Sequence, residues 1–261
     1  MEEPEEGLVR SISRRDFATG MSSLLPAYAV LHWIFAGDLL ADRHRAGAHR
    51  WLLRLNRSSD ALLGGRLTPL EWQAEVERLF GGLSLPELVE LVDLDRLSRE
   101  IEKPPDRAAA HAVMLPDVEG LPSPTAFATK VFALRKGVAI VPHGHRNMVS
   151  MHLVLGGELR LRHFDRLHDE PDHLIIQPTI DRVAKPGDLS SISSQKDNVH
   201  WFQALSEGAF TLDIIVDNLD PTLGFRYEMD FIDPVGGKAM DGGRIRARRI
   251  SFEQALRLYG P

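Results

Sequence analysis

The spacing of apolar residues along the chain changes near residue 126, and this change separates two regions. From residue 38 to about 103, apolar residues recur three or four positions apart, which is typical of helices that bury one face. From residue 127 onward, short β-prone runs alternate with Gly, Pro and Asp turns, as in all-β sandwiches and barrels. The pattern predicts a helical region at 38–103, a linker at 104–126 and a mainly β domain at 127–261.

Capping signals locate the helix starts. Thr68-Pro69-Leu70-Glu71 combines a capping box with Pro at the first helical position, and predicts a helix that ends at Phe80 before two glycines. Ser84-Leu85-Pro86-Glu87 repeats this signature, so we expect a second helix that continues to Ile101. Lys103-Pro104-Pro105 would end the helical region.

The β region contains one predicted hairpin and several further strands. Residues 151–155 and 158–162 flank Gly156-Gly157, and the second arm alternates polar with apolar residues, which predicts a hairpin. The remaining predicted strands lie at 174–176, 188–192, 200–205, 210–216 and 244–250. A short helix opened by Ser251 and closed by Gly260 follows the last strand.

Composition narrows the class of protein. The 261 residues are 43% hydrophobic and 26% charged, as in ordinary globular proteins. A net charge of −6 and a pI near 6.0 argue against a nucleic-acid-binding protein, because such proteins carry an excess of basic residues. The chain has no Cys, so it forms no disulfide and offers no thiolate as metal ligand or nucleophile.

The first 37 residues resemble a targeting segment. Residues 13–17 (SRRDF) are similar to a twin-arginine export signal, no charge follows from 18 to 37, and Ala27-Tyr28-Ala29 resembles a cleavage site. We therefore expect export to the periplasm. The alternative is a cytoplasmic N-terminal helix, which the acidic opening and the apolar Trp33 and Phe35 favour. The stretch is too mixed for a permanent membrane span.

Three histidines form the main candidate site. His143 and His145 lie two residues apart in a strand-like run and can face the same side, and His200 lies in another predicted strand. Three imidazoles can hold one divalent metal with the opposite face open to substrate. The alternative is an accidental spacing of core or surface histidines. We assign little ligand role to His152, and His163, His168 and His173 are interpreted as surface loop residues.

These residues resemble the first motif of the cupin family. That motif runs Gly, five residues, His-x-His, three or four residues, Glu, six residues, Gly; here Gly137, His143, His145 and Gly156 or Gly157 match. The Glu does not match, because its place holds Val149 or Ser150. The resemblance implies a cupin-type β-barrel, also called a double-stranded β-helix or jelly roll, behind an N-terminal helical region.

A motif with three His and no Glu is similar to that of the thiol dioxygenases, which are cupins that hold Fe(II) with three His. Residues 127–233 look most like the cysteamine dioxygenase and plant cysteine oxidase branch; the matching segments are 143–164, 198–202, 210–214 and 226–231. The resemblance implies metal ligation by His143, His145 and His200. It also implies substrate roles for Asp213 and Tyr227. With no Cys present, the Cys–Tyr cross-link of some cysteine dioxygenases cannot form.

The implied reaction inserts both atoms of dioxygen at the sulfur of a thiol to give a sulfinate. The substrate would be a small thiol or a peptide with an N-terminal Cys, and Arg135 and Lys130 are candidates to bind a substrate carboxylate. Two alternatives stay open. A three-His site with Zn, Ni or Mn can support hydrolysis or isomerisation, and a cupin pocket can serve only to bind a ligand.

Overall fold

The computed structural model describes residues 38–100, 107–113 and 115–260, and Arg45–Pro261 belong to one compact unit. The twin-arginine-like segment lies outside the described residues, as does the Lys103-Pro104-Pro105 stop, so export stays a prediction. No helix in the described part is long and apolar enough to cross a membrane.

Among the described residues, four helices precede the strands: α3 (Asp38–Leu63), α4 (Pro69–Phe80), α5 (Leu85–Leu91) and α6 (Leu94–Glu100). Helix α4 begins as predicted, because the Thr68 side chain accepts the Glu71 N–H and the Glu71 carboxylate accepts the Thr68 N–H. The predicted second helix is broken at Asp93, which has a φ of 49°. Asp tolerates this left-handed conformation, and its carboxylate accepts the Arg96 N–H to start α6.

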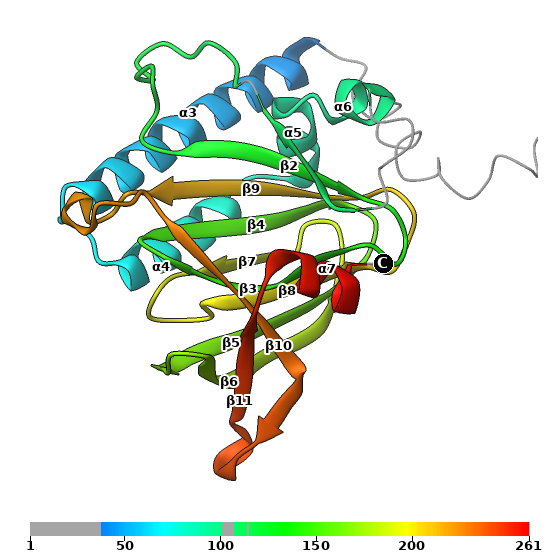
Figure 1. Ribbon diagram of the computed structural model, residues 1–261. Helices are drawn as coiled ribbons and strands as arrows, with labels where there is room; N and C mark the ends of the chain where they lie inside the picture. The colour runs from blue at the N-terminus through cyan, green and yellow to red at the C-terminus, as the bar shows by residue number, and fades with distance from the viewer. Residues whose placement is uncertain (1–37, 101–106, 114, 261) are drawn as a thin grey trace, which may run out of the picture. The chain divides into compact units, whose positions relative to one another are not determined.

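The strands form a jelly roll, as predicted (Figure 1). One sheet orders β2 (Ala128–Leu134), β9 (Ala209–Asp217), β4 (Met148–Gly156) and β7 (Leu189–Ile192), with the short β1 (Ala109–Ala112), from the predicted linker, beside β2. The facing sheet orders β3 (Ala139–Arg146), β8 (Val199–Ala204), β5 (Leu159–Asp169) and β6 (His173–Ala184). Without β1, each antiparallel sheet has these four strands, and the crossovers between the sheets define two Greek keys.

A C-terminal hairpin closes the second sheet. Strand β10 (Glu228–Ala239) pairs with β3, and β11 (Ile245–Ile250) pairs with β6, which gives a closed six-stranded barrel. Its apolar residues include Phe164, Ile176 and Ile232. Helix α7 (Phe252–Tyr259) follows with the predicted Ser251 cap. Two short 3-10 turns, η1 (Pro221–Leu223) and η2 (Asp241–Gly243), lie in this region.

Helices α4 and α5 contact the outer face of the first sheet, through β4 and β7 (Figure 1). Trp72 and Val76 of α4 are fully buried. A polar bridge crosses the same contact: Gln73 donates to Ser191 Oγ at 3.0 Å, and this hydroxyl donates to Glu77 at 2.6 Å. The outer face of the sheet that carries Ser191 is therefore covered by helices.

The predicted hairpin around Gly156-Gly157 is wrong. Strand β4 pairs with β7 and β9, whereas β5 pairs with β6 and β8, so the two arms lie in opposite sheets. The two glycines carry the chain across the sandwich. Gly157 has a φ of 71°, and a Cβ on it would lie 2.7 Å from Ala209 Cα. Alternation of apolar residues predicts strands but does not say which sheet they join.

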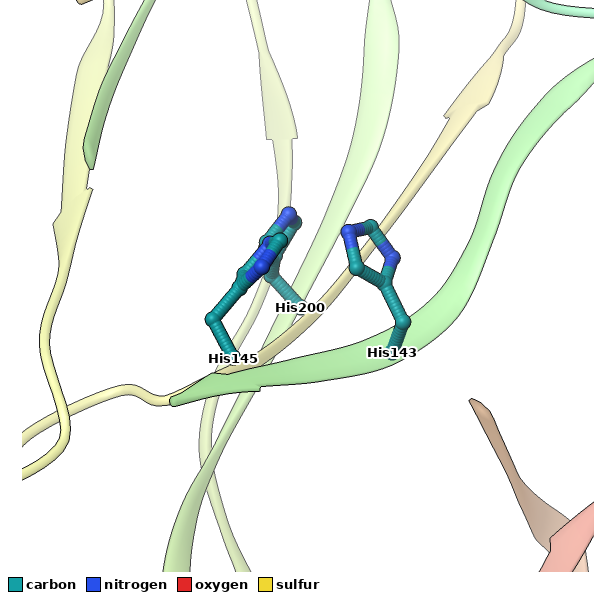
Figure 2. Close-up of side chains that lie close together, drawn as sticks. All are labelled: His143, His145 and His200. Carbon is teal, nitrogen blue, oxygen red and sulfur yellow. The ribbon is translucent and has the colours of Figure 1, made fainter. Parts of the chain in front are cut away.

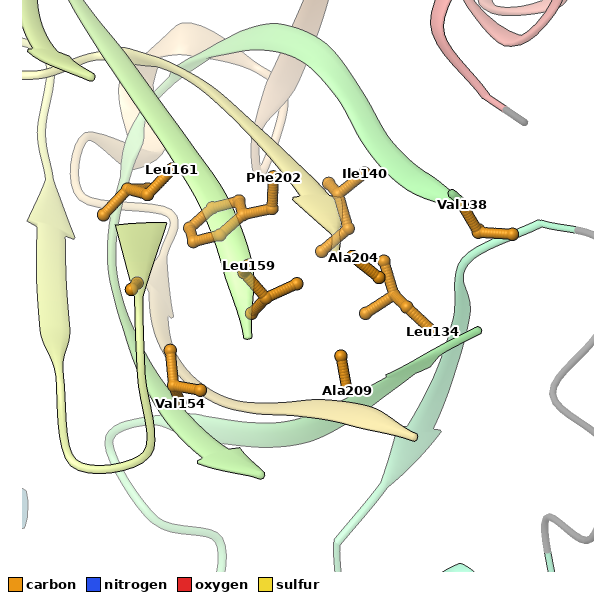
Figure 3. Packing of buried hydrophobic residues seen from close by; sticks show 10 residues of the cluster. Leu134, Val138, Ile140, Val154, Leu159, Leu161, Phe202, Ala204 and Ala209 are labelled. Atoms are coloured by element: carbon orange, nitrogen blue, oxygen red, sulfur yellow. The ribbon is translucent and has the colours of Figure 1, made fainter. Parts of the chain in front are cut away.

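Apolar residues from both sheets fill one part of the jelly-roll interior (Figure 3). Leu134 and Ala209 come from β2 and β9, and Leu159 and Phe202 from β5 and β8. Further along these strands the inward-facing residues become polar, as at Thr211 on β9. The interior is thus divided into an apolar part and a polar part.

We predict that Gly157→Ala destabilises the protein more than Gly187→Ala. Both glycines have positive φ, but a Cβ at Gly187 meets no heavy atom within 4 Å. The left-handed conformation should cost each variant ~1–2 kcal/mol, and the clash at Gly157 should add ~1–3 kcal/mol. Urea unfolding midpoints measure the difference; equal losses would contradict the sheet-crossing turn.

Candidate metal centre

Strand register brings histidines of three neighbouring strands into one row. His143 on β3 lies opposite His200 on β8, and His200 lies opposite His163 on β5. Directly opposed residues of an antiparallel sheet point to the same face. That face also carries Phe202, which belongs to the apolar interior cluster. All three imidazoles therefore face the jelly-roll interior.

His143, His145 and His200 converge as predicted (Figure 2). One ligand atom from each lies within 4.8 Å of the others, and the ring centroids of His143 are 4.6 Å from His145 and 4.2 Å from His200. The three residues are 5%, 7% and 1% exposed. They form a compact group that could hold one metal ion.

The protonation state of the three rings suits a metal. Burial lowers the pKa of His143 to about 4, and it lowers the pKa of His145 and His200 well below the usual value, with neighbouring imidazoles adding to the effect. The rings are therefore neutral near pH 7. Neutral imidazole is the form that binds a metal, so no proton has to be displaced.

Backbone contacts orient the group. His143 Nδ1 lies 2.7 Å from the Val141 carbonyl oxygen, so Nδ1–H donates to it and Nε2 keeps its lone pair. Asn198 Nδ2 donates to the carbonyl oxygens of His145, at 2.7 Å, and Ser193, at 3.0 Å. This amide ties the start of β8 to the end of β3. The residues fit a divalent ion of the kind that imidazole binds, such as Fe, Zn, Cu or Ni.

A second polar row faces the metal group from the other sheet. Lys130 on β2, Asp213 on β9, His152 on β4 and Ser190 on β7 are paired in register. The His152 ring centroid lies 4.9 Å from that of His200, which shows that the two rows meet across the interior. We call this set of four residues the facing row.

His152 lies at the site, although the sequence pattern indicates little ligand role for it. Its Nε2 lies 3.1 Å from Ser150 Oγ, and its Nδ1 lies 2.9 Å from Asp213 Oδ1. The Asp213 contact has the distance of an ion pair but not the direction of a hydrogen bond. The signal in the sequence is the alternation of Ser150, His152 and Val154, which gives all three the same face of β4.

The other predicted site residues differ in position. Ser150, at the place of the cupin Glu, faces inward with His152, and Val149 occupies the opposite face of β4. Asp213 is 2% exposed and accepts a hydrogen bond from Thr211. Tyr227 directly precedes β10 and is 46% exposed, so it lies at the surface. The substrate roles of Asp213 and Tyr227 stay predictions.

The interpretation of His163, His168 and His173 as loop residues is wrong. His163 and His168 belong to β5, and His173 begins β6. His163 is completely buried, with both ring nitrogens lacking a hydrogen-bond partner, and burial lowers its pKa to about 3. The five-residue spacing was misleading because β5 is bulged at two places in its pairing with β6.

We predict that His200→Gln abolishes metal binding. Loss of one of three imidazole ligands should weaken affinity by more than ~100-fold, beyond the usual cost of changing an outer hydrogen-bond partner. Metal content after loading and desalting, with circular dichroism to verify folding, measures this. His168→Gln, at an exposed position of β5, is the control and should retain the metal. Equal metal content in the two variants would contradict the assignment.

We predict that His163→Leu stabilises the metal-free protein, increasingly so in acid. The folded-state pKa is lowered, so the neutral ring is required for folding and stability is lost as the pH falls from 6.5 towards 3. Removing this ring should widen the stability difference from wild type by ~1–2 kcal/mol between pH 7 and pH 5. Urea midpoints at both values test this, with exposed His168→Leu as control; a pH-independent difference would refute it.

Comparisons with known proteins identify no family. No protein-family profile matches the chain, and no curated protein is significantly similar.

Solved structures with similar parts include procruciferin, an 11S globulin from Brassica napus. It has 16% identity over 41% of this chain and 23% of that chain, with a TM-score of 0.30. An oxalate oxidase in complex with glycolate has 18% identity over 49% and 56% of the chains and a TM-score of 0.33. A protein with a double-stranded beta-helix domain from Klebsiella pneumoniae subsp. pneumoniae has 15% identity over 45% and 80% of the chains and a TM-score of 0.32. At these scores the likenesses carry no inference about activity.

Proposed function

We propose that this protein is an Fe(II)-dependent dioxygenase that converts a thiol to a sulfinate. The observation that carries the proposal is a buried group of three neutral imidazoles with Ser150, and not a carboxylate, at the place of the cupin Glu. The reaction balances as one thiol plus one dioxygen giving one sulfinic acid. Both oxygen atoms end on sulfur, and no other reductant is needed.

The charge of the ligand set supports a substrate that binds as an anion. Three neutral imidazoles leave the dipositive charge of a bound ion uncompensated, and a low-dielectric interior strengthens its attraction for an anion. The inward-facing carboxylate of Asp213 already contacts His152 and accepts a hydrogen bond from Thr211. A thiolate is an anion whose formation such a cation favours.

The surrounding residues would position the substrate and exclude water. Fe(II), when bound, supplies the electron chemistry with dioxygen and lowers the pKa of the thiol. Phe202 packs against both His200 and His152 and closes the apolar side of the site. His152, held between Ser150 and Asp213, presents a fixed polar ring opposite the metal group. The imidazole group is thereby left with a polar wall on one side and an apolar wall on another.

We predict that the iron-loaded protein consumes dioxygen with at least one small thiol. An oxygen electrode would follow uptake with an aminothiol, a mercapto acid and a peptide with an N-terminal Cys, and mass spectrometry would detect a product heavier by two oxygen atoms. One dioxygen should be consumed per thiol. No uptake with any of these thiols, at verified full iron occupancy, would refute the proposal.

Two controls connect this activity to the site. His200→Gln should be inactive, and His168→Gln should be active, because only the former removes a ligand. Ser150→Glu and Ser150→Gln introduce side chains of equal size, but only the former restores a carboxylate beside the metal. Ser150→Glu should therefore bind thiols more weakly than Ser150→Gln; equal binding would contradict the charge argument.

A further inference from the structure

Four charged side chains form a ring at one end of the six-stranded barrel. Arg166 of β5 donates to the Asp169 carboxylate from Nε, at 2.7 Å, and from Nη2, and its Nη1 lies 2.7 Å from Asp230 Oδ2 on β10. Arg249 of β11 donates to the same two carboxylates. We call Arg166, Asp169, Asp230 and Arg249 the ionic ring. It links three strands of the barrel through alternating charges.

The pair of Arg166 and Asp230 lies behind β3, on the side away from the imidazoles. Asp230 is opposite Gly144 in the pairing of β10 with β3, and the face of Gly144 is opposite to the one that carries His143 and His145. The side chains of Arg166 and Asp230 are only 8% and 12% exposed. Separating the two groups would leave two poorly hydrated charges uncompensated, so the structure opposes their movement apart.

The ionic ring reaches the metal group through Gly144. A Cβ on Gly144 would lie 3.6 Å from Arg166 Nη1, so the guanidinium packs against the backbone between the two histidines. The same Cβ would lie 2.7 Å from Asn198 Oδ1, and the Asn198 amide donates to the His145 carbonyl oxygen at 2.7 Å. Gly144 does not have a positive φ, so the requirement for glycine comes from space and not from backbone conformation.

We propose that Arg166 is a positioning residue for the metal group, because its bridge between two carboxylates fixes the backbone of β3 at Gly144. This backbone sets the distance between the imidazoles of His143 and His145. Metal–ligand distances in proteins vary by only about 0.2 Å, so a small displacement of one strand changes how an ion is held. The inference goes beyond the proposed thiol chemistry, since it concerns whichever divalent ion the imidazoles bind.

The bridge needs the shape of a guanidinium group and not only its charge. Arg166 contacts Asp169 with two nitrogens and Asp230 with the third. A lysine has a single ammonium group on a flexible stem and lacks this rigid fork, so it cannot reproduce the set of contacts. Arg166→Lys therefore keeps the positive charge and removes the bridge.

A purely structural role makes a different prediction. The ionic ring also joins β5 to the C-terminal hairpin, so its loss could lower stability without any effect on the metal group. The visible absorption spectrum of bound Co(II) separates the two roles, because its bands report the coordination geometry of the ion and not the stability of the fold.

The test uses Co(II) alone, without thiol or oxygen. Arg166→Lys should shift the absorption bands of bound Co(II) and weaken its binding by ~10-fold, the lower end of the range for residues that orient metal ligands. Arg160→Lys is the matched control, because it makes the same change on the same strand in an exposed pair with Asp181. It should bind Co(II) with the spectrum and affinity of wild type. Thermal unfolding establishes that each variant is folded at the temperature of measurement.

Gly144→Ala tests the same contact from the other side and decides the question if Arg166→Lys does not fold. It leaves every charge in place but crowds Asn198 and Arg166, so it should also shift the Co(II) bands. A wild-type spectrum and affinity in either folded variant would overturn the inference. Failure of wild type to bind Co(II) would overturn the inference and the metal group together. Absence of thiol oxidation would refute only the proposed function.

Discussion

The register between β3 and β8 is the constraint on which the candidate site depends. It sets His143 opposite His200, and the two-residue period of a strand then brings His145 to the same interior face. A shift of one residue would turn one strand's histidines to the other face. The facing row depends on the same kind of pairing, because Lys130, Asp213 and His152 converge only through the registers of β2, β9 and β4.

The interior has two parts. The apolar cluster and the candidate metal group lie at different ends of the same strands. Leu159 and Leu161 pack in the apolar cluster, and His163 follows on the same face of β5. Burial lowers the pKa of His143 and keeps its imidazole neutral. The folded protein is therefore less stable in acid, where the unfolded chain binds a proton at this residue, and the apolar packing must offset that loss of stability. The strands that carry the metal group, β3 and β8, also contribute Ile140 and Phe202 to that packing.

Sequence patterns predicted local structure well because local interactions determine it. The Thr68 cap depends on residues within one helical turn, and His143 and His145 share a face because they lie two residues apart on one strand. The assignment of β4 and β5 to different sheets, and the burial of His163, depend on long-range pairing and on bulges, which leave no trace in apolar alternation. Asp93 was missed for a local reason: its left-handed backbone converts one helical pattern into two helices.

The C-terminal hairpin has a consequence for the solubility of the protein. Strand β3 bonds to β8 on one side and to β10 on the other, and β11 covers the corresponding edge of β6. A free strand edge is a template for pairing with another chain, and closure of the barrel removes both edges of this sheet. A chain that lost the hairpin would expose the strand that carries His143 and His145 to intermolecular pairing, so aggregation and loss of the metal group would occur together.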